Sequence, residues 1–192
     1  MKKIIALGSG EGSTIDFFCQ KIQEEKPNFK ITALITENPQ SGLLKTAEKY
    51  NLPCHVIPYN KKDFNAWDQK LCDTLLLYKS SLIVLAGFLK KIGPIVLKKF
   101  PKQIINSHPA LLPDFSGAGM YGLKIHQAVI KANKSKTGVS IHRVNAEYDK
   151  GRILSQKIIP IEKNETAVEL EKKVKQIEKP FYFQTIRQIL NK

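Results

Sequence analysis

An amide and an imidazole stand two positions apart in the stretch INSHPALLPDF, at Asn106 and His108, and a carboxylate, Asp149, follows in the segment YDKGR. Alternate residues of an extended segment face one side, so Asn106 and His108 can point to one place. Acyl transfer to an amine needs such an amide, an imidazole that moves or holds a proton, and a carboxylate that orients the imidazole. Each residue type is also common in structural roles, so both interpretations stay open here.

Pro109 and Pro113 stiffen the chain that follows the histidine. Each proline lacks an N–H and biases the residue before it away from helix, so residues 105–115 are expected to form a stiff loop. The loop follows the apolar run KQII, which could end a buried strand. Asn106 and His108 would then emerge at the carboxyl end of that strand, the edge where open α/β sheets bind ligands.

The second chemical signal is the glycine-rich segment GSGEGS, residues 8–13, between an apolar run and an amphipathic stretch. Glycines allow a sharp turn with exposed N–H groups, and a helix start adds a partial positive charge, so the segment suits an anion. Its spacing differs from the G-x-G-x-x-G dinucleotide motif, and no lysine stands in the P-loop position. A plain strand-to-helix turn is the alternative.

The elements that must position these residues alternate between strand and helix. Strands are expected at 3–7, 30–36, 54–59, 81–87, 103–106, 137–144 and 153–161, and helices at 13–26, 41–51, 63–79, after Pro94, at 123–133 and from 165 to the end. This order predicts an α/β fold with a doubly wound, mostly parallel sheet flanked by helices. The last two strand patterns alternate and could pair, which predicts antiparallel pairing near the C-terminal end.

Length and composition indicate one domain of 192 residues, with a nucleotide- and phosphate-binding lobe at 1–93 and a catalytic lobe at 94–192. The 3 cysteines match no disulfide framework or zinc spacing, and no apolar run nears the ~18 residues of a membrane span, which favours a cytoplasmic protein without metal. The net charge of +14 comes mostly from scattered lysines. It indicates a solvated surface that attracts anions, rather than a nucleic-acid or membrane partner.

Four segments, in order, carry a resemblance: GSGEGST, LAGFLKKI (85–92), INSHPALLP and YDKGRIL. Together they resemble the phosphoribosylglycinamide formyltransferases, also called glycinamide ribonucleotide transformylases, from residue 5 to about residue 180. The N-x-H-P-x-L-L-P element with a downstream D-x-G is the specific part, whereas the glycine segment is weak alone. The resemblance implies a Rossmann-like fold and transfer of a formyl group from 10-formyltetrahydrofolate to glycinamide ribonucleotide in purine biosynthesis.

The resemblance also implies a role for each matching residue. Catalysis would fall to Asn106, which binds the formyl oxygen, and to His108 supported by Asp149 in proton transfer, with no metal. The acceptor nucleotide would be bound by Gly12, Ser13, Thr14, Lys175 and Glu178. The folate pocket would be lined by Lys62, Leu89, Lys90, Lys91, Ile92, Leu97, Asn106 and Arg143. The expected partners are these small molecules, for a monomer or a homodimer.

The chain departs from the family pattern at Glu11, Thr14, Arg143 and Ala146. Two alternatives therefore remain. The first is formyl transfer to another amine, such as an amino sugar nucleotide, and the second is a non-catalytic protein that binds nucleotides or nucleic acids. Related methionyl-tRNA formyltransferases carry a further C-terminal domain, and formyltetrahydrofolate hydrolases carry an extra N-terminal one. A chain of 192 residues is therefore expected to be neither.

Overall fold

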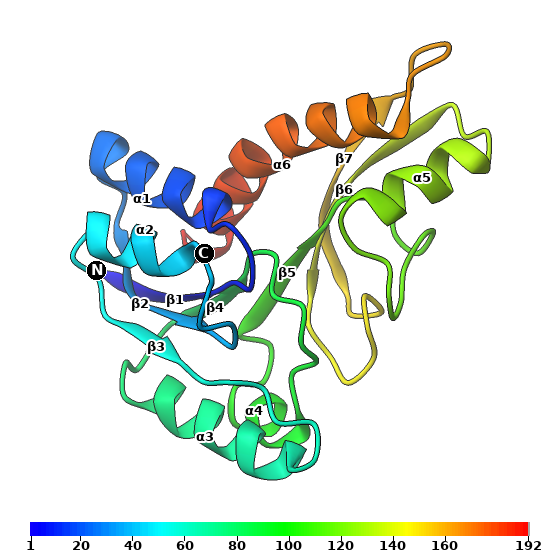
Figure 1. Cartoon of the computed structure of the whole chain (residues 1–192). Helices are drawn as coiled ribbons and strands as arrows, with labels where there is room; N and C mark the ends of the chain where they lie inside the picture. The colour runs from blue at the N-terminus through cyan, green and yellow to red at the C-terminus, as the bar shows by residue number, and fades with distance from the viewer. Residues whose placement is uncertain (192) are drawn as a thin grey trace. The chain divides into compact units, whose positions relative to one another are not determined.

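The computed structural model describes residues 1–191 and has the expected α/β architecture, a mostly parallel sheet flanked by helices (Figure 1). Seven strands are hydrogen-bonded in the order β3-β2-β1-β4-β5-β6-β7. The strands are β1 Lys2–Leu7, β2 Phe29–Thr36, β3 Cys54–Val56, β4 Leu82–Leu85, β5 Ile104–His108, β6 Lys136–Arg143 and β7 Ile153–Pro160. The helices are α1 Ser13–Glu25, α2 Leu43–Lys49, α3 Phe64–Leu76, α4 Pro94–Lys99, α5 Leu123–Lys131 and α6 Ala167–Leu190. The fold class read from the sequence is therefore confirmed.

The chain forms two compact units, one of residues 1–105 with Leu190 and Asn191, and one of residues 106–189. The binding lobes 1–93 and 94–192 remain a prediction about ligands.

In the first unit, β1 pairs in parallel with β2 on one side and with β4 on the other. Helices α1 and α2 cover one face of these strands, and α3 and α4 lie on the opposite face (Figure 1). The strand order changes direction between β1 and β4, so the segments that follow these two strands meet at the switch point where α/β sheets bind ligands. The glycine segment follows β1, and residues 86–93 follow β4.

In the second unit, β6 and β7 pair in antiparallel register from Lys136–Pro160 to His142–Ile153, with one irregularity between Ile141 and His142. The antiparallel pairing predicted for the end of the chain is therefore confirmed. Gly138 in β6 has no room for a side chain, because a Cβ there would overlap the carbonyl oxygen of Lys157 and the side chain of Leu111.

The structure corrects the expected start of the proline loop: β5 runs through Asn106, Ser107 and His108, and the loop begins only at Pro109. A residue before proline is biased to extended geometry, so His108 can end a strand as well as begin a loop. The expected strand at 54–59 is also shorter, ending at Val56.

Candidate active site

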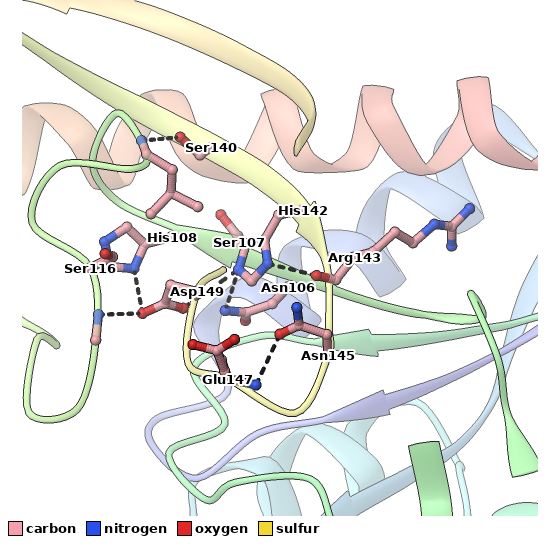
Figure 2. Close-up of polar contacts among 12 residues, drawn as sticks. Asn106, Ser107, His108, Ser116, Ser140, His142, Arg143, Asn145, Glu147 and Asp149 are labelled. Atoms are coloured by element: carbon pink, nitrogen blue, oxygen red, sulfur yellow. Dashed lines mark hydrogen bonds and ion pairs between the residues drawn. The ribbon is translucent and has the colours of Figure 1, made fainter. Parts of the chain in front are cut away.

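The extended geometry of β5 sends its polar side chains to opposite faces of the strand. Ser107 donates a hydrogen bond from Oγ to Oε1 of Glu178 on α6, at 2.6 Å. Asn106 and His108 face the other way, toward residues of β6 and of the loop that joins β6 to β7 (Figure 2). The two-residue spacing therefore places the amide and the imidazole on one side, as the sequence predicted.

Asp149 lies between two imidazoles. Its Oδ2 is 3.5 Å from Nδ1 of His108, and its Oδ1 is 3.5 Å from Nε2 of His142. The N–H of Gly117 also donates to Oδ2, at 3.2 Å. Burial opposes ionisation, but the adjacent His142 imidazole, the nearby His108 and the Gly117 N–H together hold the pKa of the Asp149 carboxyl below its usual range. The carboxylate is therefore charged at neutral pH.

His142 links the carboxylate to the amide (Figure 2). Its Nδ1 is 2.9 Å from the carbonyl oxygen of Arg143, which can only accept, so Nδ1 carries a proton. In the neutral ring Nε2 is then an acceptor, and the Asn106 Nδ2 lies 3.2 Å from it. His142 thereby accepts one amide hydrogen of Asn106 and fixes the plane of the amide. The second amide hydrogen of Asn106 remains available for donation to another acceptor.

His108 is 3% exposed, and each of its ring nitrogens has an acceptor nearby. Besides Asp149 at Nδ1, the carbonyl oxygen of Phe115 lies 2.9 Å from Nε2. Burial lowers the pKa of His108, while Asp149 and the Phe115 carbonyl raise it by less. The neutral ring thus faces two acceptors that suit its charged form. Both acceptors stabilise the ring once it is protonated.

The loop that carries Asp149 depends on Gly151. A Cβ at residue 151 would overlap the carbonyl oxygen of Arg143, the same oxygen that holds Nδ1 of His142. Asp149 itself has a φ of 55°, in the left-handed region that aspartate tolerates better than most residues. The D-x-G spacing therefore has a backbone reason: the glycine allows the close approach that brings Asp149 to the imidazoles.

The glycine segment after β1 is held by the residues that precede α2. Asn38 donates from Nδ2 to the carbonyl of Ser9 at 3.1 Å, and Ser41 donates from Oγ to the carbonyl of Gly10 at 2.8 Å. Gly12 caps α1 with a φ of 75°, without a side-chain cap. The first N–H groups of an α-helix have no helical acceptor, so those of Ser13 and Thr14 suit an anion.

Residues 86–93, after β4, are anchored by a carboxylate of α3. Asp68 is 0% exposed and accepts hydrogen bonds from the N–H groups of Gly93, at 3.1 Å, and Ile95, at 2.8 Å. The same segment contacts the glycine segment, because the Leu89 N–H donates to Oγ of Ser9 at 2.9 Å. Within the first unit, the two segments at the switch point therefore form one hydrogen-bonded structure.

The residues expected around the folate differ in exposure. Leu89 is 47% exposed, whereas Ile92 is buried at 3%. Leu97 is half-buried in α4. The Nζ of Lys90 lies 5.0 Å from the ring centroid of Tyr59. Lys62 and Lys91 are exposed.

The residues expected to bind the nucleotide fall in both units, with Gly12, Ser13 and Thr14 in the first and Lys175 and Glu178 in the second. The Nζ of Lys175 pairs with Oε1 of Glu171 at 2.9 Å on the exposed side of α6.

Two features are absent from residues 1–191. None of the described helices is long and apolar enough to cross a membrane. Within the same residues, no group of three or more His, Cys, Asp or Glu side chains could hold a metal ion.

Comparison with protein families matches residues 2–186 to a family described as formyl transferase. The chain belongs to the formyl transferase family. A phosphoribosylglycinamide formyltransferase of Bacillus subtilis is 30% identical over 191 residues, which cover 99% of this chain and 95% of that protein. A chloroplastic one of Arabidopsis thaliana is 35% identical over 96% of this chain, but the match spans only 64% of that protein. The crystal structure of phosphoribosylglycinamide formyltransferase from Bacillus halodurans has a TM-score of 0.89 and 28% identity, covering 100% of this chain and 96% of that one.

The site residues assigned from the sequence of this formyl transferase do not include His142, Asp68, or the pair Asn38 and Ser41. His142 carried a weak signal, since it alternates with Ile141 in a strand near the D-x-G segment. Asp68 could have been found as a carboxylate on the apolar face of a helix. The support of the glycine segment by Asn38 and Ser41 had no sequence signal, because it depends on contacts between distant segments.

Proposed function

We propose that this formyl transferase moves the formyl group of 10-formyltetrahydrofolate to the amine of glycinamide ribonucleotide, a step of de novo purine biosynthesis. The amine attacks the formyl carbon directly, and Asn106, His108 and Asp149 assist. The observation that carries the proposal is the Asp149 carboxylate, which lies 3.5 Å from both His108 and His142. The names of the relatives support the choice of acceptor.

Asn106 stabilises the charge that develops on the formyl oxygen. His142 accepts one amide hydrogen of Asn106, so the other can be donated to that oxygen. A fixed donor costs no reorganisation when the charge forms, and this makes it more effective than water.

His108 moves the proton. Because burial lowers its pKa from 6.5, the ring is neutral at pH 7. Once the Phe115 carbonyl has moved away from Nε2, that nitrogen accepts the proton that the attacking amine loses. Asp149 stabilises the resulting imidazolium through Nδ1. His108 then gives the proton to the folate nitrogen as the bond between that nitrogen and the formyl carbon breaks. The ring ends neutral, so the cycle closes without a metal.

The ligand contacts are part of the proposal. Gly12, Ser13 and Thr14 bind the phosphate through backbone N–H groups, with Lys175 as a charged partner and Glu178 near the ribose or the amine. The folate lies against Leu89 to Ile92, Leu97 and the main chain at Arg143, with Lys62 toward its glutamate end. The half-exposed Leu89 supports this, since an apolar side chain suits the flat face of a heteroaromatic ring.

Formyl transfer from a 10-formyl folate, followed by absorbance, tests the proposal, with glycinamide ribonucleotide and an amino sugar nucleotide offered as separate acceptors. We expect turnover with the ribonucleotide. Turnover with the sugar nucleotide alone would show that the acceptor is not glycinamide ribonucleotide and would contradict a role in purine biosynthesis. A folded protein that uses neither acceptor would contradict formyl transfer to these amines.

A further inference from the structure

Two of the three arginines in the chain lie opposite each other where β6 meets β7. The N–H of Arg143 donates to the carbonyl oxygen of Arg152 at 2.9 Å, just beyond the His142–Ile153 pair. Residues directly opposite in an antiparallel pair project to the same face. The two guanidinium groups therefore belong to one face at the base of residues 144–151, the loop that carries Asp149.

No carboxylate within residues 1–191 pairs with these two guanidinium groups. The acids of the loop have other partners, since Glu147 pairs with Lys150 at 2.9 Å and Asp149 faces the two imidazoles. Like charges directly opposite each other destabilise a strand pair unless something compensates them.

The Arg143 side chain also has an unused donor. Its Nη1 is buried and has no hydrogen-bond partner among the described residues. Burial and the charge of Arg152 both lower the pKa of Arg143, as expected for a guanidinium group with a like charge nearby and no acidic partner among residues 1–191. Figure 2 shows the guanidinium pointing away from His108 and Asp149, so the catalytic group does not use it.

We propose that Arg143 and Arg152 together bind a phosphate dianion at the base of the 144–151 loop. Two guanidinium groups without an acid carry two positive charges, which a phosphate dianion balances and a single carboxylate does not. The planar fork of arginine matches phosphate oxygens in pairs, and its N–H groups make strong charge-assisted hydrogen bonds. The site is separate from the catalytic residues and goes beyond the proposed function.

The bound phosphate would join the two ends of the loop. Arg143 precedes the loop and Arg152 follows it, while Gly151 packs against the Arg143 carbonyl. An anion held by both side chains would therefore fix the segment that presents Asp149.

The small number of arginines makes a direct test possible. In protein labelled with nitrogen-15, the side-chain Nε–Hε signals come from Arg143, Arg152 and Arg187 only. We expect titration with inorganic phosphate to shift two of the three signals along one saturating curve, while the Arg187 signal stays in place. The Arg152→Gln variant identifies its own signal and should weaken the phosphate response of Arg143 about tenfold or more, the loss expected for one charge-assisted contact.

The matched control is Lys157→Gln, which removes one exposed positive charge from β7 and should leave the phosphate response unchanged. Static Arg143 and Arg152 signals, or an equal loss of response in the control, would overturn the site. A second titration with a nucleoside monophosphate distinguishes a nucleotide from free phosphate as the ligand. Tighter binding of the nucleotide than of inorganic phosphate indicates a nucleotide, and equal binding indicates the free ion. The signals do not depend on turnover, so failure of the proposed formyl transfer would leave this test intact.

Discussion

At the scale of single residues, the charge of Asp149 supports the His108 imidazole. Asp149→Asn keeps the shape of the side chain but removes the charge that supports the His108 imidazolium. We expect turnover to fall by a factor on the order of a hundred to ten thousand, the usual range for lost acid–base assistance. The Michaelis constants should change little, because the contact strengthens only as the charge develops. Steady-state kinetics with both substrates measures this split.

The matched control is Asp114→Asn, which removes an exposed carboxylate paired with Lys134 at 3.1 Å. It should leave turnover nearly unchanged. Near-normal turnover in a folded Asp149→Asn protein would mean that Asn106, His108 and Asp149 are structural, and that the proline loop only shapes a pocket.

Asn106 and His142 should act as one unit, because the imidazole fixes the plane of the amide at a distance of 3.2 Å. Asn106→Ala should lose about 2.7 to 4 kcal/mol of transition-state stabilisation, the range for one oxyanion donor. Once Asn106 is gone, His142→Leu should cost less than it does alone, with a coupling of about 0.5 to 3 kcal/mol. A double-mutant cycle on kcat measures the coupling, and strictly additive losses would show that His142 does not position the amide.

The ionised Glu178 carboxyl should lower the free energy of unfolding at neutral pH. Burial raises its pKa above the ordinary value of 4.5, so the folded state prefers the protonated carboxyl. The stability that the protonated Glu178 adds is complete below the pKa of this carboxyl in the unfolded chain, and it is lost as pH rises through the higher pKa in the folded protein. Glu178→Gln keeps an acceptor for Ser107, so Tm should rise at pH 7 by about 2 to 4 °C, the shift for 1 kcal/mol in a domain of this size. Thermal melts at pH 4 and pH 7 should show the gain only at pH 7, and an equal gain at both would contradict the assignment.

At the scale of elements, the D-x-G loop depends on a glycine that touches backbone. Gly151→Ala would place its Cβ on the carbonyl oxygen of Arg143, and neither backbone segment can give way cheaply. We expect a loss of about 1 to 3 kcal/mol in the free energy of unfolding, the usual cost of overpacking. Gly10→Ala is the control, since a Cβ there meets nothing within 4 Å. Chemical denaturation compares the two, and equal stability would show that the loop accommodates the methyl group.

The sequence predicts the elements well and their long-range contacts poorly. Apolar runs and glycines were sufficient to place β1 and α1, because these signals are local. The extension of β5 through His108 was missed, since extended geometry before a proline suits a strand end and a loop equally. Contacts from Asp68 to Gly93 and from His142 to Asn106 join residues 25 and 36 positions apart, and no local pattern specifies them.

At the scale of the whole molecule, the net charge of +14 should attract anions without creating a nucleic-acid interface. The lysines are scattered along the chain, so contacts with RNA should be non-specific and sensitive to salt. We expect labelled single-stranded RNA to bind at physiological salt with a dissociation constant of about 10⁻⁴ to 10⁻⁶ M, measured by fluorescence anisotropy. A nanomolar complex that resists added salt would revive the nucleic-acid alternative.

The Phe115 carbonyl, 2.9 Å from Nε2 of His108, means that any compound aimed at this imidazole competes with the protein itself. Its observed affinity equals its intrinsic affinity multiplied by the fraction of molecules in which the carbonyl has moved away. Inhibitors that anchor elsewhere and leave the ring alone escape this penalty. Inhibitors that need the His108 ring should bind more tightly to variants with a weakened 109–122 loop than to the natural protein. Shape complementarity to the resting structure would predict the opposite order of affinities.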